Sequence, residues 1–368
     1  MILYINGNYP FHSLHKELVN KLADRGDKIT VFVPLRGKEY FGKYDSNNDN
    51  VKVIYSNILT IPDRIFFINK IKKIVEKIEE TIDISEIECI LAGTVYSDGA
   101  VAYLLHKKYN IPFSVTVRET DVTYHMKWRP YLNSFIRNML KEVSQIIFIS
   151  PSYQRYFEKF KCDKNKYKTI PNAVNDYWYE GINNNRTLHS PLSVIYVGEI
   201  SKRKNVNTII KVIALLHKKG IKTELNIIGA GKEQSKCELL SGRLGIKEYV
   251  RFHGWQDSKE NIKRFYECAD IFAMPSIRET FGTVYIEALS QGLPIIYTKG
   301  QGIDGYFDQG TIGFACDPKN VDEIAAAILM IVNDYSSYSA RALEKSKIFQ
   351  WTEVSKKYSK VLNDMRGR

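Results

Sequence analysis

The stretch PSIRETFGTVYIEALSQGLP, residues 275–294, decides how the second half of this chain folds and what it can bind. A short apolar run, Ile271–Met274, comes directly before it and predicts a buried strand. Gly282 then lies in a loop ahead of an apolar segment with helical periodicity, so the order is strand, loop and helix. Glu279 falls in the loop. Glu287, after seven intervening residues, falls about one turn inside the helix.

The start of this helix predicts an anion site. The backbone N–H groups of Phe281, Gly282, Thr283 and Val284 would point out of the helix N-terminus, where the helix dipole favours a diphosphate. Gly282 would allow the phosphate to approach closely. The carboxylate of Glu287 could accept hydrogen bonds from a ribose. For one pair of glutamates, a helix cap and a surface residue would be the simpler interpretation, but the full string favours a binding site.

Short apolar runs alternate with helical patterns along the whole chain, which is typical of parallel α/β sheets. The predicted strands are Met1–Ile5, Ile29–Val33, Val51–Ile54, Cys89–Ala92, Phe113–Val117 and Gln145–Ile149, then Ser193–Val197, Glu224–Ile228, Val250–His253, Ile271–Met274, Pro294–Thr298 and Gly313–Ala315. A break rich in Asn, Gly, Ser and Pro separates two such series. We therefore expect a first domain over 1–178, a linker over 179–190, a second domain over 191–348 and a final helical segment over 349–368 that packs back on the first domain. Ligands would bind at the carboxyl ends of the strands.

Further segments around the 275–294 stretch complete a pattern that resembles glycosyltransferase family 4. The stretch itself resembles the E-x7-E signature of that family, and the other segments occur in the family's order across most of residues 170–320. These segments are VGEISKRKN (197–205), LNIIGAG (225–231), VRFHGW (250–255), YECADIFAMPS (266–276) and IPNAVN (170–175). The resemblance implies the GT-B fold, with two Rossmann-like doubly wound α/β domains facing a central cleft. It also implies transfer of a sugar from a nucleotide diphosphate sugar with retention of the anomeric configuration.

The resemblance assigns roles to individual residues. It implies that Glu279 lies beside the transferred sugar, Glu287 binds the ribose and Lys204 pairs with the donor phosphates. This suits the chemistry, because a diphosphate leaving group needs fixed cations and N–H donors. Lys204 is otherwise one lysine among many on a basic protein. Where the family has an arginine, this chain has Glu199, and Arg203 is the candidate replacement cation. The remaining predicted donor-binding residues are Gly198, His253, Gly254, Phe281, Gly282, Thr283 and Val284.

The first domain departs from the family's pattern in two places. Arg118 and Glu119 stand where the family has His-Gly, while Asp121 is retained, and residues 8–13 replace a Gly-Gly loop. We predict that Arg118 and Asp121 contribute to catalysis from this domain. A surface salt bridge is an equally good interpretation of Arg118. His12 and His15 are expected to be surface residues.

Composition narrows the class of protein. The net charge of +12 is spread along the chain without an arginine-rich arm, which disfavours nucleic acid and leaves a solvated lysine-rich surface as the simplest interpretation. The five cysteines form no C-x-x-C pair, and no metal-binding cluster or D-x-D motif appears, so we predict metal-independent chemistry in a cytoplasmic protein. Gly229-Ala230-Gly231 lacks the third glycine of a dinucleotide fingerprint. The expected ligands are a UDP- or GDP-linked sugar and a carbohydrate or lipid-linked acceptor.

Contact with the inner face of a membrane is a further hypothesis. The segment Arg64–Thr81 has an apolar helical face and a lysine face, and Tyr124–Arg129 adds an aromatic and basic cluster. The alternative is a helix packed on its own domain, with the lysines in solvent. The apolar face consists of Phe67, Ile71, Ile74, Val75 and Ile78, and the basic face of Lys70, Lys73 and Lys77. Two functional alternatives also stay open: a catalytically silent GT-B subunit and a nucleotide-sugar epimerase-like enzyme.

Overall fold

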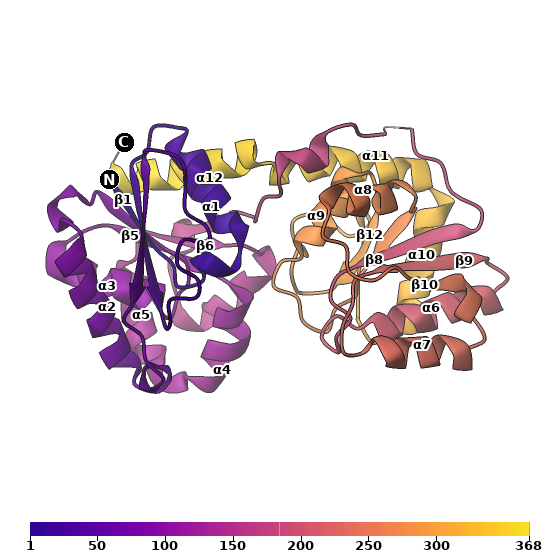
Figure 1. Ribbon diagram of the computed structural model, residues 1–368, viewed down its shortest axis with the longest axis horizontal. Helices are drawn as coiled ribbons and strands as arrows, with labels where there is room; N and C mark the ends of the chain where they lie inside the picture. The colour runs from indigo at the N-terminus through magenta and orange to yellow at the C-terminus, as the bar shows by residue number, and fades with distance from the viewer. Residues whose placement is uncertain (184, 368) are drawn as a thin grey trace. The chain divides into compact units, whose positions relative to one another are not determined.

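The computed structural model describes residues 1–183 and 185–367, and the chain forms two compact α/β units (Figure 1). The first unit takes in residues 1–149, 153–173 and the chain from Trp351 onward, and the second takes in 150–152 and 174–350. Asn184, within the predicted linker, and Arg368, at the end of the predicted final segment, lie outside the described residues. The described residues include no helix that is both long enough and apolar enough to span a bilayer.

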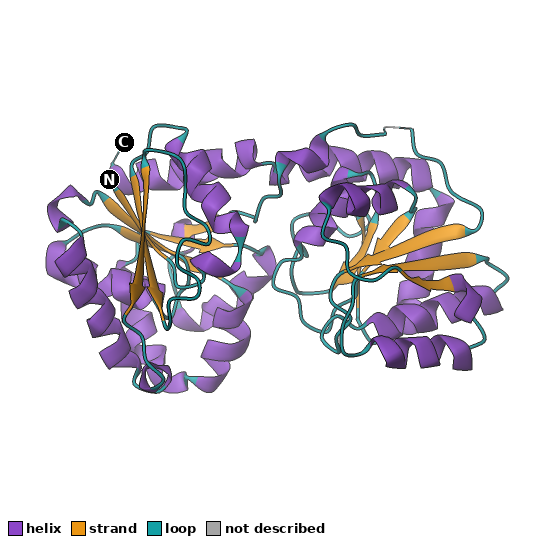
Figure 2. Ribbon diagram, viewed as in Figure 1, coloured by secondary structure: helices purple, strands orange, loops and turns teal. Residues whose placement is uncertain are grey.

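The first unit is built on a seven-stranded parallel sheet with the order β3-β2-β1-β4-β5-β6-β7, covered by helices on both faces (Figure 2). Its strands are mostly apolar runs that are fully buried. Only β7, which carries a lysine at its centre, was absent from the prediction. The strands are β1 (Ile2–Ile5), β2 (Ile29–Leu35), β3 (Val51–Asn57), β4 (Cys89–Ala92), β5 (Phe113–Val117), β6 (Gln145–Phe148) and β7 (Tyr167–Thr169).

Two helices from opposite ends of the chain share one core of the first unit. Helix α12 runs beside α1, and its residues Trp351, Val354, Tyr358 and Val361 are buried in the same cluster as Leu18 (Figure 1). On the other side, α2 buries the apolar face that the sequence had offered to a membrane and packs against α3. That face is therefore core. The helices are α1 (Ser13–Ala23), α2 (Phe67–Thr81), α3 (Asp98–Tyr109), α4 (Met126–Trp128), α5 (Asn133–Glu142) and α12 (Trp351–Arg366).

The second unit repeats the plan with a six-stranded parallel sheet of order β10-β9-β8-β11-β12-β13. Its strands are β8 (Leu192–Val197), β9 (Thr223–Ile228), β10 (Val250–Phe252), β11 (Ile271–Ala273), β12 (Ile295–Thr298) and β13 (Gly313–Cys316). Its helices are α6 (Val206–Lys218), α7 (Gln234–Arg243), α8 (Lys259–Glu267), α9 (Thr283–Ser290), α10 (Val321–Asn333) and α11 (Tyr335–Ser346). The predicted fold class, two doubly wound α/β domains, is confirmed.

The strand order reverses once in each sheet, between β1 and β4 in the first and between β8 and β11 in the second. Loops that leave neighbouring strands on the two sides of such a reversal diverge, which opens a crevice at the carboxyl ends of the strands. In the second unit these loops carry Lys204 after β8 and Glu279 after β11. The topology therefore brings together two residues that lie 75 positions apart in the sequence.

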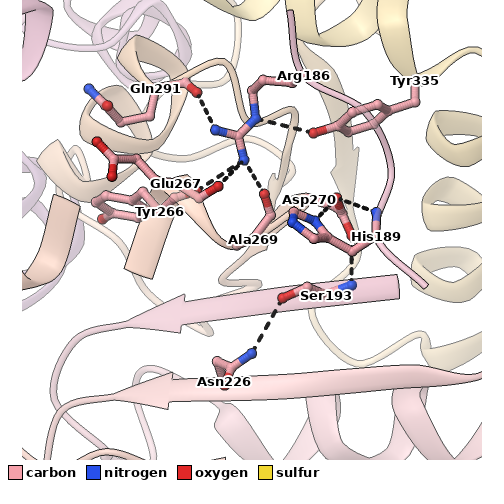
Figure 3. A network of polar contacts seen from close by, with 10 residues as sticks. All are labelled: Arg186, His189, Ser193, Asn226, Tyr266, Glu267, Ala269, Asp270, Gln291 and Tyr335. Atoms are coloured by element: carbon pink, nitrogen blue, oxygen red, sulfur yellow. Dashed lines mark hydrogen bonds and ion pairs between the residues drawn. The ribbon is translucent and has the colours of Figure 1, made fainter. Parts of the chain in front are cut away.

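A buried arginine ties the segment before β8 to the second unit (Figure 3). The guanidinium of Arg186 donates to the carbonyls of Tyr266 at 3.1 Å, Glu267 at 3.2 Å and Ala269, where α8 ends, and to that of Gln291 at 3.1 Å, where α9 ends. The last carbonyls of a helix have no partner within the helix and carry partial negative charge, so a cation is favourable there. Arg186 thus fixes the ends of the two helices that carry the candidate site's aromatic and acidic residues.

Candidate active site

Three glycines bring the strand ends of the second sheet into close backbone contact. Gly198 follows β8, and its N–H donates to Ile228 at 2.9 Å, while the N–H of Gly229 donates to the carbonyl of Gly254 at 2.8 Å. Gly229 has a φ of +139°, and a Cβ there would lie 1.9 Å from the carbonyl oxygen of Gly198. No side chain fits in that space. Gly198 and Gly254, both predicted to bind the donor, therefore each contact Gly229 through backbone atoms alone.

The central feature of the site is a shielded ion pair between Lys204 and Glu279. The Lys204 Nζ lies 2.7 Å from the Glu279 Oε2, and the two side chains are only 12% and 6% exposed. The same carboxylate oxygen accepts a hydrogen bond from Ser276 Oγ at 3.2 Å, and the ammonium also lies 3.7 Å from the sulfur of Met274. Because both charges are nearly out of solvent, each depends on the other. These contacts give the Lys204 ammonium a fixed position.

Two residues that sequence reasoning did not single out hold this pair in place. Asn205 has a left-handed backbone with φ of +61°, and its side-chain amide donates to the carbonyls of Pro275 at 3.0 Å and Pro318 at 2.7 Å. Gln301, in the loop after β12, accepts a hydrogen bond from the N–H of Glu279 at 2.8 Å. Asn tolerates this backbone conformation better than most residues, so its presence next to Lys204 was the available signal. Gln301 belongs to no recognisable motif.

The start of α9 has the geometry that the sequence predicts. Gly282 caps the helix with φ of +78°, and a Cβ there would lie 2.4 Å from the ring of Tyr285. The Tyr285 hydroxyl donates to the carbonyl of Met274 at 2.5 Å and so ties the helix to the end of β11. The first N–H groups of a helix lack partners within the helix, which leaves the amides around Thr283 and Val284 as donors. Phe281 is buried, so only its backbone can serve the site.

Glu287 lies on α9 with its carboxylate in a poorly solvated position. The Tyr266 hydroxyl, itself fully buried, donates to Glu287 Oε2 at 3.4 Å. Burial raises the pKa of Glu287 to about 7, and the hydrogen bond from Tyr266 and the charge of Lys259 only partly oppose that rise. A carboxylate held at such a pKa is one that the fold keeps short of hydrogen-bond donors.

Two other residues that were predicted to bind the donor, Arg203 and His253, have separate partners. Arg203 is exposed and donates to the carbonyl of Arg278 at 3.3 Å, in the loop that carries Glu279. Glu199 is exposed at the end of β8. The His253 ring pairs instead with Asn226 at 2.9 Å and lines a cavity of about 610 Å³ between the sheet and α8. Of the predicted donor-binding residues, only His253 lines that cavity.

In the first unit, Asp121 and Arg118 form one arrangement around the carboxyl ends of β4 and β5. Asp121 is fully buried and accepts from the backbone N–H groups of Arg118 at 2.9 Å, Val95 at 3.2 Å and Tyr96 at 3.4 Å. Burial raises the pKa of Asp121 to about 7, against those hydrogen bonds. The Arg118 Nε donates to the carbonyl of Gly93 at 2.8 Å. Asp121 therefore fixes the backbone of the two loops that follow β4 and β5. Arg118 is half-buried and lies next to the end of β4.

The prediction that His15 is a surface residue was wrong. His15 is 2% exposed, and its Nδ1 lies 2.9 Å from the hydroxyl of Tyr4, because α1 presses that ring onto β1. Burial lowers the pKa of His15 well below its ordinary value. His12 is exposed, as expected. No group of three or more His, Cys, Asp or Glu side chains suited to a metal ion occurs in the described part of the chain.

Comparison with known proteins gives the family. The profile of the group 1 glycosyl transferases matches residues 182–347, and that of glycosyltransferase family 4 matches residues 15–177. An uncharacterized glycosyltransferase of Methanocaldococcus jannaschii is 25% identical over 245 residues, which are 62% of each chain. The lipopolysaccharide core biosynthesis glycosyltransferase LpsE of Rhizobium meliloti is 33% identical over 143 residues, 39% of this chain and 40% of LpsE. The matched parts thus span less than two thirds of either relative.

A solved structure shows the same fold over the whole length. HepE of Anabaena superposes with a TM-score of 0.74 at 18% identity, covering 98% of this chain and 99% of HepE. The two matched profiles between them take in most of the chain, one in each unit. The protein belongs to the glycosyltransferases of family 4 and carries the group 1 region in its second unit.

Proposed function

We propose that the protein transfers a sugar from a nucleotide diphosphate sugar to an acceptor hydroxyl with retention of the anomeric configuration. The observation that carries this proposal is the shielded Lys204–Glu279 pair at the strand reversal of the second sheet, beside the N-terminus of α9. A cation, a carboxylate and free helix N–H groups converge there. These are the groups that a departing diphosphate and a sugar rich in hydroxyls would need.

In the proposed reaction, the bond between the anomeric carbon and the diphosphate oxygen breaks while the acceptor oxygen bonds to the same carbon. The acceptor proton passes to the departing phosphate oxygen on the same face of the sugar, which preserves the configuration. Negative charge grows on the diphosphate, where Lys204 and the first amides of α9 stabilise it. Glu279, whose Oε2 already accepts from Ser276 and Lys204, orients the sugar through its hydroxyls.

The nucleotide half of the donor is assigned to α9 and the strand ends. Glu287 would accept hydrogen bonds from the ribose hydroxyls, and these donors would supply what its carboxylate lacks. HepE of Anabaena was solved with UDP and with UDP-glucose, which supports a UDP-linked sugar over the GDP-linked alternative.

The acceptor is proposed to be a carbohydrate or lipid-linked carbohydrate in the assembly of a surface polysaccharide or glycolipid. The likeness to LpsE, a protein of lipopolysaccharide core biosynthesis, supports this class of acceptor. Such a substrate would place the enzyme at the cytoplasmic face of a membrane. Arg118, next to the strand ends of the first unit, is the side chain that we assign to the acceptor side.

We propose that catalysis needs no divalent metal, because Lys204 and the helix N-terminus supply the positive charge that a metal would otherwise bring. Activity of the purified enzyme is expected to survive EDTA. Loss of activity in EDTA with recovery on adding Mg²⁺ would contradict this part of the proposal.

Nucleotide binding is the first test. UDP, GDP, ADP, their common sugar conjugates and NAD are compared by thermal shift, because a ligand that binds only the folded protein raises its melting temperature. A shift with one nucleotide, lost in Glu287→Ala and kept in Glu248→Ala, is expected; Glu248 is an exposed glutamate of the same unit. The absence of any shift would favour a silent subunit.

Transfer is the second test. The nucleotide sugar that gives the shift is incubated with the enzyme and a lipid-linked acceptor pool, and the configuration of the product linkage is determined by NMR. Lys204→Met should abolish transfer, whereas Lys202→Met, which removes an exposed lysine from the same loop, should leave it near the parent level. Epimerised or hydrolysed donor as the sole product, whether or not acceptor is present, would favour an epimerase-like enzyme. A product of inverted configuration would refute the retaining mechanism.

A further inference from the structure

A small basic cavity lies in the first unit, and none of the residues assigned to the donor lines it. It has a volume of about 150 Å³ and lies between the turn Pro62–Arg64 with the start of α2 on one side and the segment around α4 on the other. Four cationic side chains line it, and Asp63 is the single acid among the described lining residues. The cationic residues are Arg36, Arg64, Lys70 and Arg129.

The one acid in the cavity wall is already neutralised. Asp63 accepts hydrogen bonds from the N–H of Thr60 at 2.6 Å and from the Lys73 Nζ at 3.1 Å. These partners lower the pKa of Asp63 against the opposing effect of burial. Lys73 does not line the cavity. The acid is therefore matched by a fifth cation, and the lining keeps an excess of positive charge.

Two polar groups at the cavity lack hydrogen-bond partners. Tyr96 is 0% exposed, and within the described residues no group bonds to its hydroxyl or to the Nδ1 of His125. Both side chains line the cavity, and their rings are stacked with centroids 4.9 Å apart. A buried polar group without a partner is costly, so native proteins usually satisfy it with protein, water or ligand. These two atoms are the groups at the cavity that a water or a ligand oxygen would satisfy.

Lys70 shows how strongly the cations of the cavity act on one another. Its Nζ donates to Ser97 Oγ at 2.7 Å. Burial lowers the pKa of Lys70; Asp98 and Asp63 oppose this, while Arg129 and Arg36 lower it further. An anion in the cavity would relieve the repulsion among these groups.

Several exposed apolar side chains belong to the two segments that line the cavity. Arg129 donates to the carbonyl of Arg64 at 3.0 Å and so joins the two segments that carry them. Each of these side chains is at least 44% exposed, and we call them the apolar rim. The apolar rim consists of Ile61, Ile65, Phe66, Ile68, Tyr124, Trp128 and Tyr131. They alternate along the chain with the residues that line the cavity, so the same two segments carry the cavity lining and the apolar rim.

We propose that this cavity binds the phosphate group of an anionic membrane lipid while the apolar rim lies in the bilayer interface. Cations fit the phosphate charge, and the Tyr96 hydroxyl and the imidazole of His125 fit its oxygens. A soluble phosphate would account for the cations but would leave the apolar rim in water, whereas a bilayer covers both. The surface differs from the apolar face of α2, which is core.

The position of the cavity connects it to the acceptor. A second cavity, of about 460 Å³, opens at the ends of β1 and β2 beside Gly7 and shares Arg36, Leu59 and Arg64 with the first. If the protein is the glycosyltransferase proposed above, a lipid-linked acceptor held by its phosphate would present its sugar to this second cavity. Lipid binding itself does not depend on that step.

A neutral substitution tests the cavity most sharply. The full-length protein is sedimented with vesicles of phosphatidylglycerol and phosphatidylcholine in equal parts, and with phosphatidylcholine alone, at about 0.15 M salt. Tyr96→Phe removes one hydroxyl and no charge, and we expect it to raise the lipid concentration for half-binding about tenfold, since a hydrogen bond to a charged group is lost. Tyr109→Phe is the matched control, because Tyr109 lies on α3 of the same unit and outside the cavity. Equal binding by the Tyr96→Phe variant and the parent would overturn the site.

A pair of lysines on one helix separates the cavity from general electrostatic attraction. Lys70→Met and Lys72→Met remove the same charge from α2, but Lys72 is exposed and does not line the cavity. We expect at least a fivefold larger loss of vesicle binding for Lys70→Met than for Lys72→Met. Equal losses would mean that the vesicles sense only surface charge, which contradicts a defined phosphate site.

A soluble probe distinguishes the two sources of phosphate. Trp128→Ala, in the apolar rim, should weaken vesicle binding several-fold and leave calorimetric binding of inorganic phosphate unchanged. Tight phosphate binding, together with vesicle binding that is unchanged in Trp128→Ala, would show that the cavity takes a soluble phosphate. That outcome would refute the proposal of a membrane lipid. A thermal shift with UDP reports on the donor site and on folding. Vesicle binding without that shift would leave the lipid site standing while the proposed transferase activity fails.

Discussion

Replacing Glu287 with glutamine should make the protein more stable and less able to bind its nucleotide. Burial raises the pKa of this carboxyl from 4.5 to about 7, so the folded state disfavours the charged form. One pKa unit corresponds to about 1.4 kcal/mol, and the gap therefore amounts to a cost of about 3 kcal/mol when Glu287 is ionised. Glutamine has nearly the same shape and bears no charge, so Glu287→Gln removes that cost.

The pH dependence has a definite sign. Between pH 4.5 and 7 the folded protein holds a proton on Glu287 that the unfolded chain has released. The stability due to the neutral form is present in full below pH 4.5 and is lost as the pH rises through 7. The difference in unfolding free energy between Glu287→Gln and the parent should therefore be near zero at about pH 4.5, grow by about 1.4 kcal/mol per pH unit, and level off near 3 kcal/mol above pH 7.

Urea unfolding of both proteins between pH 5 and 9, followed by circular dichroism, measures this difference, with Glu248→Gln as the exposed control. Nucleotide affinity moves the other way. The parent should bind its nucleotide about tenfold more weakly per pH unit below 7, and Glu287→Gln should bind weakly at every pH. A stability difference that stays flat across the pH range would refute the raised pKa and the desolvation that causes it.

Three further substitutions test the framework of the second unit. Gly229→Ala should cost at least about 3 kcal/mol and abolish nucleotide binding, because its Cβ would lie 1.9 Å from the Gly198 carbonyl oxygen; urea unfolding and thermal shift measure both. Arg186→Met should destabilise the unit by about 3 kcal/mol by leaving buried carbonyls without a partner, whereas the exposed Arg243→Met should change little in the same titration. Lys204→Met should lower kcat/KM at least about 100-fold, because the departing diphosphate loses its fixed cation; steady-state kinetics on the donor measures the loss.

Most of the fold could be predicted from the sequence because its strands are buried apolar runs. Cys89–Ala92 and Phe113–Val117 have the predicted bounds, and every residue of both strands is buried. Strand β7 could not be predicted: Tyr167–Thr169 is short, half-buried and centred on a lysine, and it forms only because β6 offers an edge to pair with. The hydrogen bonds from Arg186 to the ends of α8 and α9 also could not be predicted, because they go to backbone carbonyls, which every residue carries.

The candidate site could be predicted where a motif fixes the backbone, and not where tertiary packing decides. The conformation of Gly282 and the proximity of Lys204 to Glu279 follow from the order of motifs. Gln301 supports Glu279 from a loop with no motif, so only the folded chain reveals it. His15 shows the opposite error: a histidine next to polar residues looked exposed, but α1 turns it onto Tyr4. The roles of these residues in binding and catalysis stay predictions.

The amphipathic pattern of α2 shows why an apolar face alone does not indicate its partner. Phe67, Ile71 and Ile78 have the spacing expected both of a membrane-surface helix and of a packed one, and the neighbouring α3 decides in favour of packing. The side chains left exposed lie instead in the turn before α2, at the first turn of α2 and around α4, where no regular spacing marks them. Ile65 and Trp128, at 75% and 64% exposure, are brought to one place by folding.

Positive charge is paired with a carboxylate in the second unit and is in excess in the cavity of the first. This difference bears on how the proposed ligands would bind. In the second unit the charge of Lys204 is paired with Glu279 at 2.7 Å, so a diphosphate bound there would compete with a built-in carboxylate. In the first unit the cavity is lined by four cations and one acid, Asp63, which Lys73 already neutralises. In the proposed reaction, the built-in carboxylate favours release of the nucleoside diphosphate, because Glu279 pairs with Lys204 again as the product leaves. In the proposed lipid site, the excess of positive charge favours long residence on an anionic surface. The two proposals together predict brief occupancy of the donor site and longer attachment through the first unit.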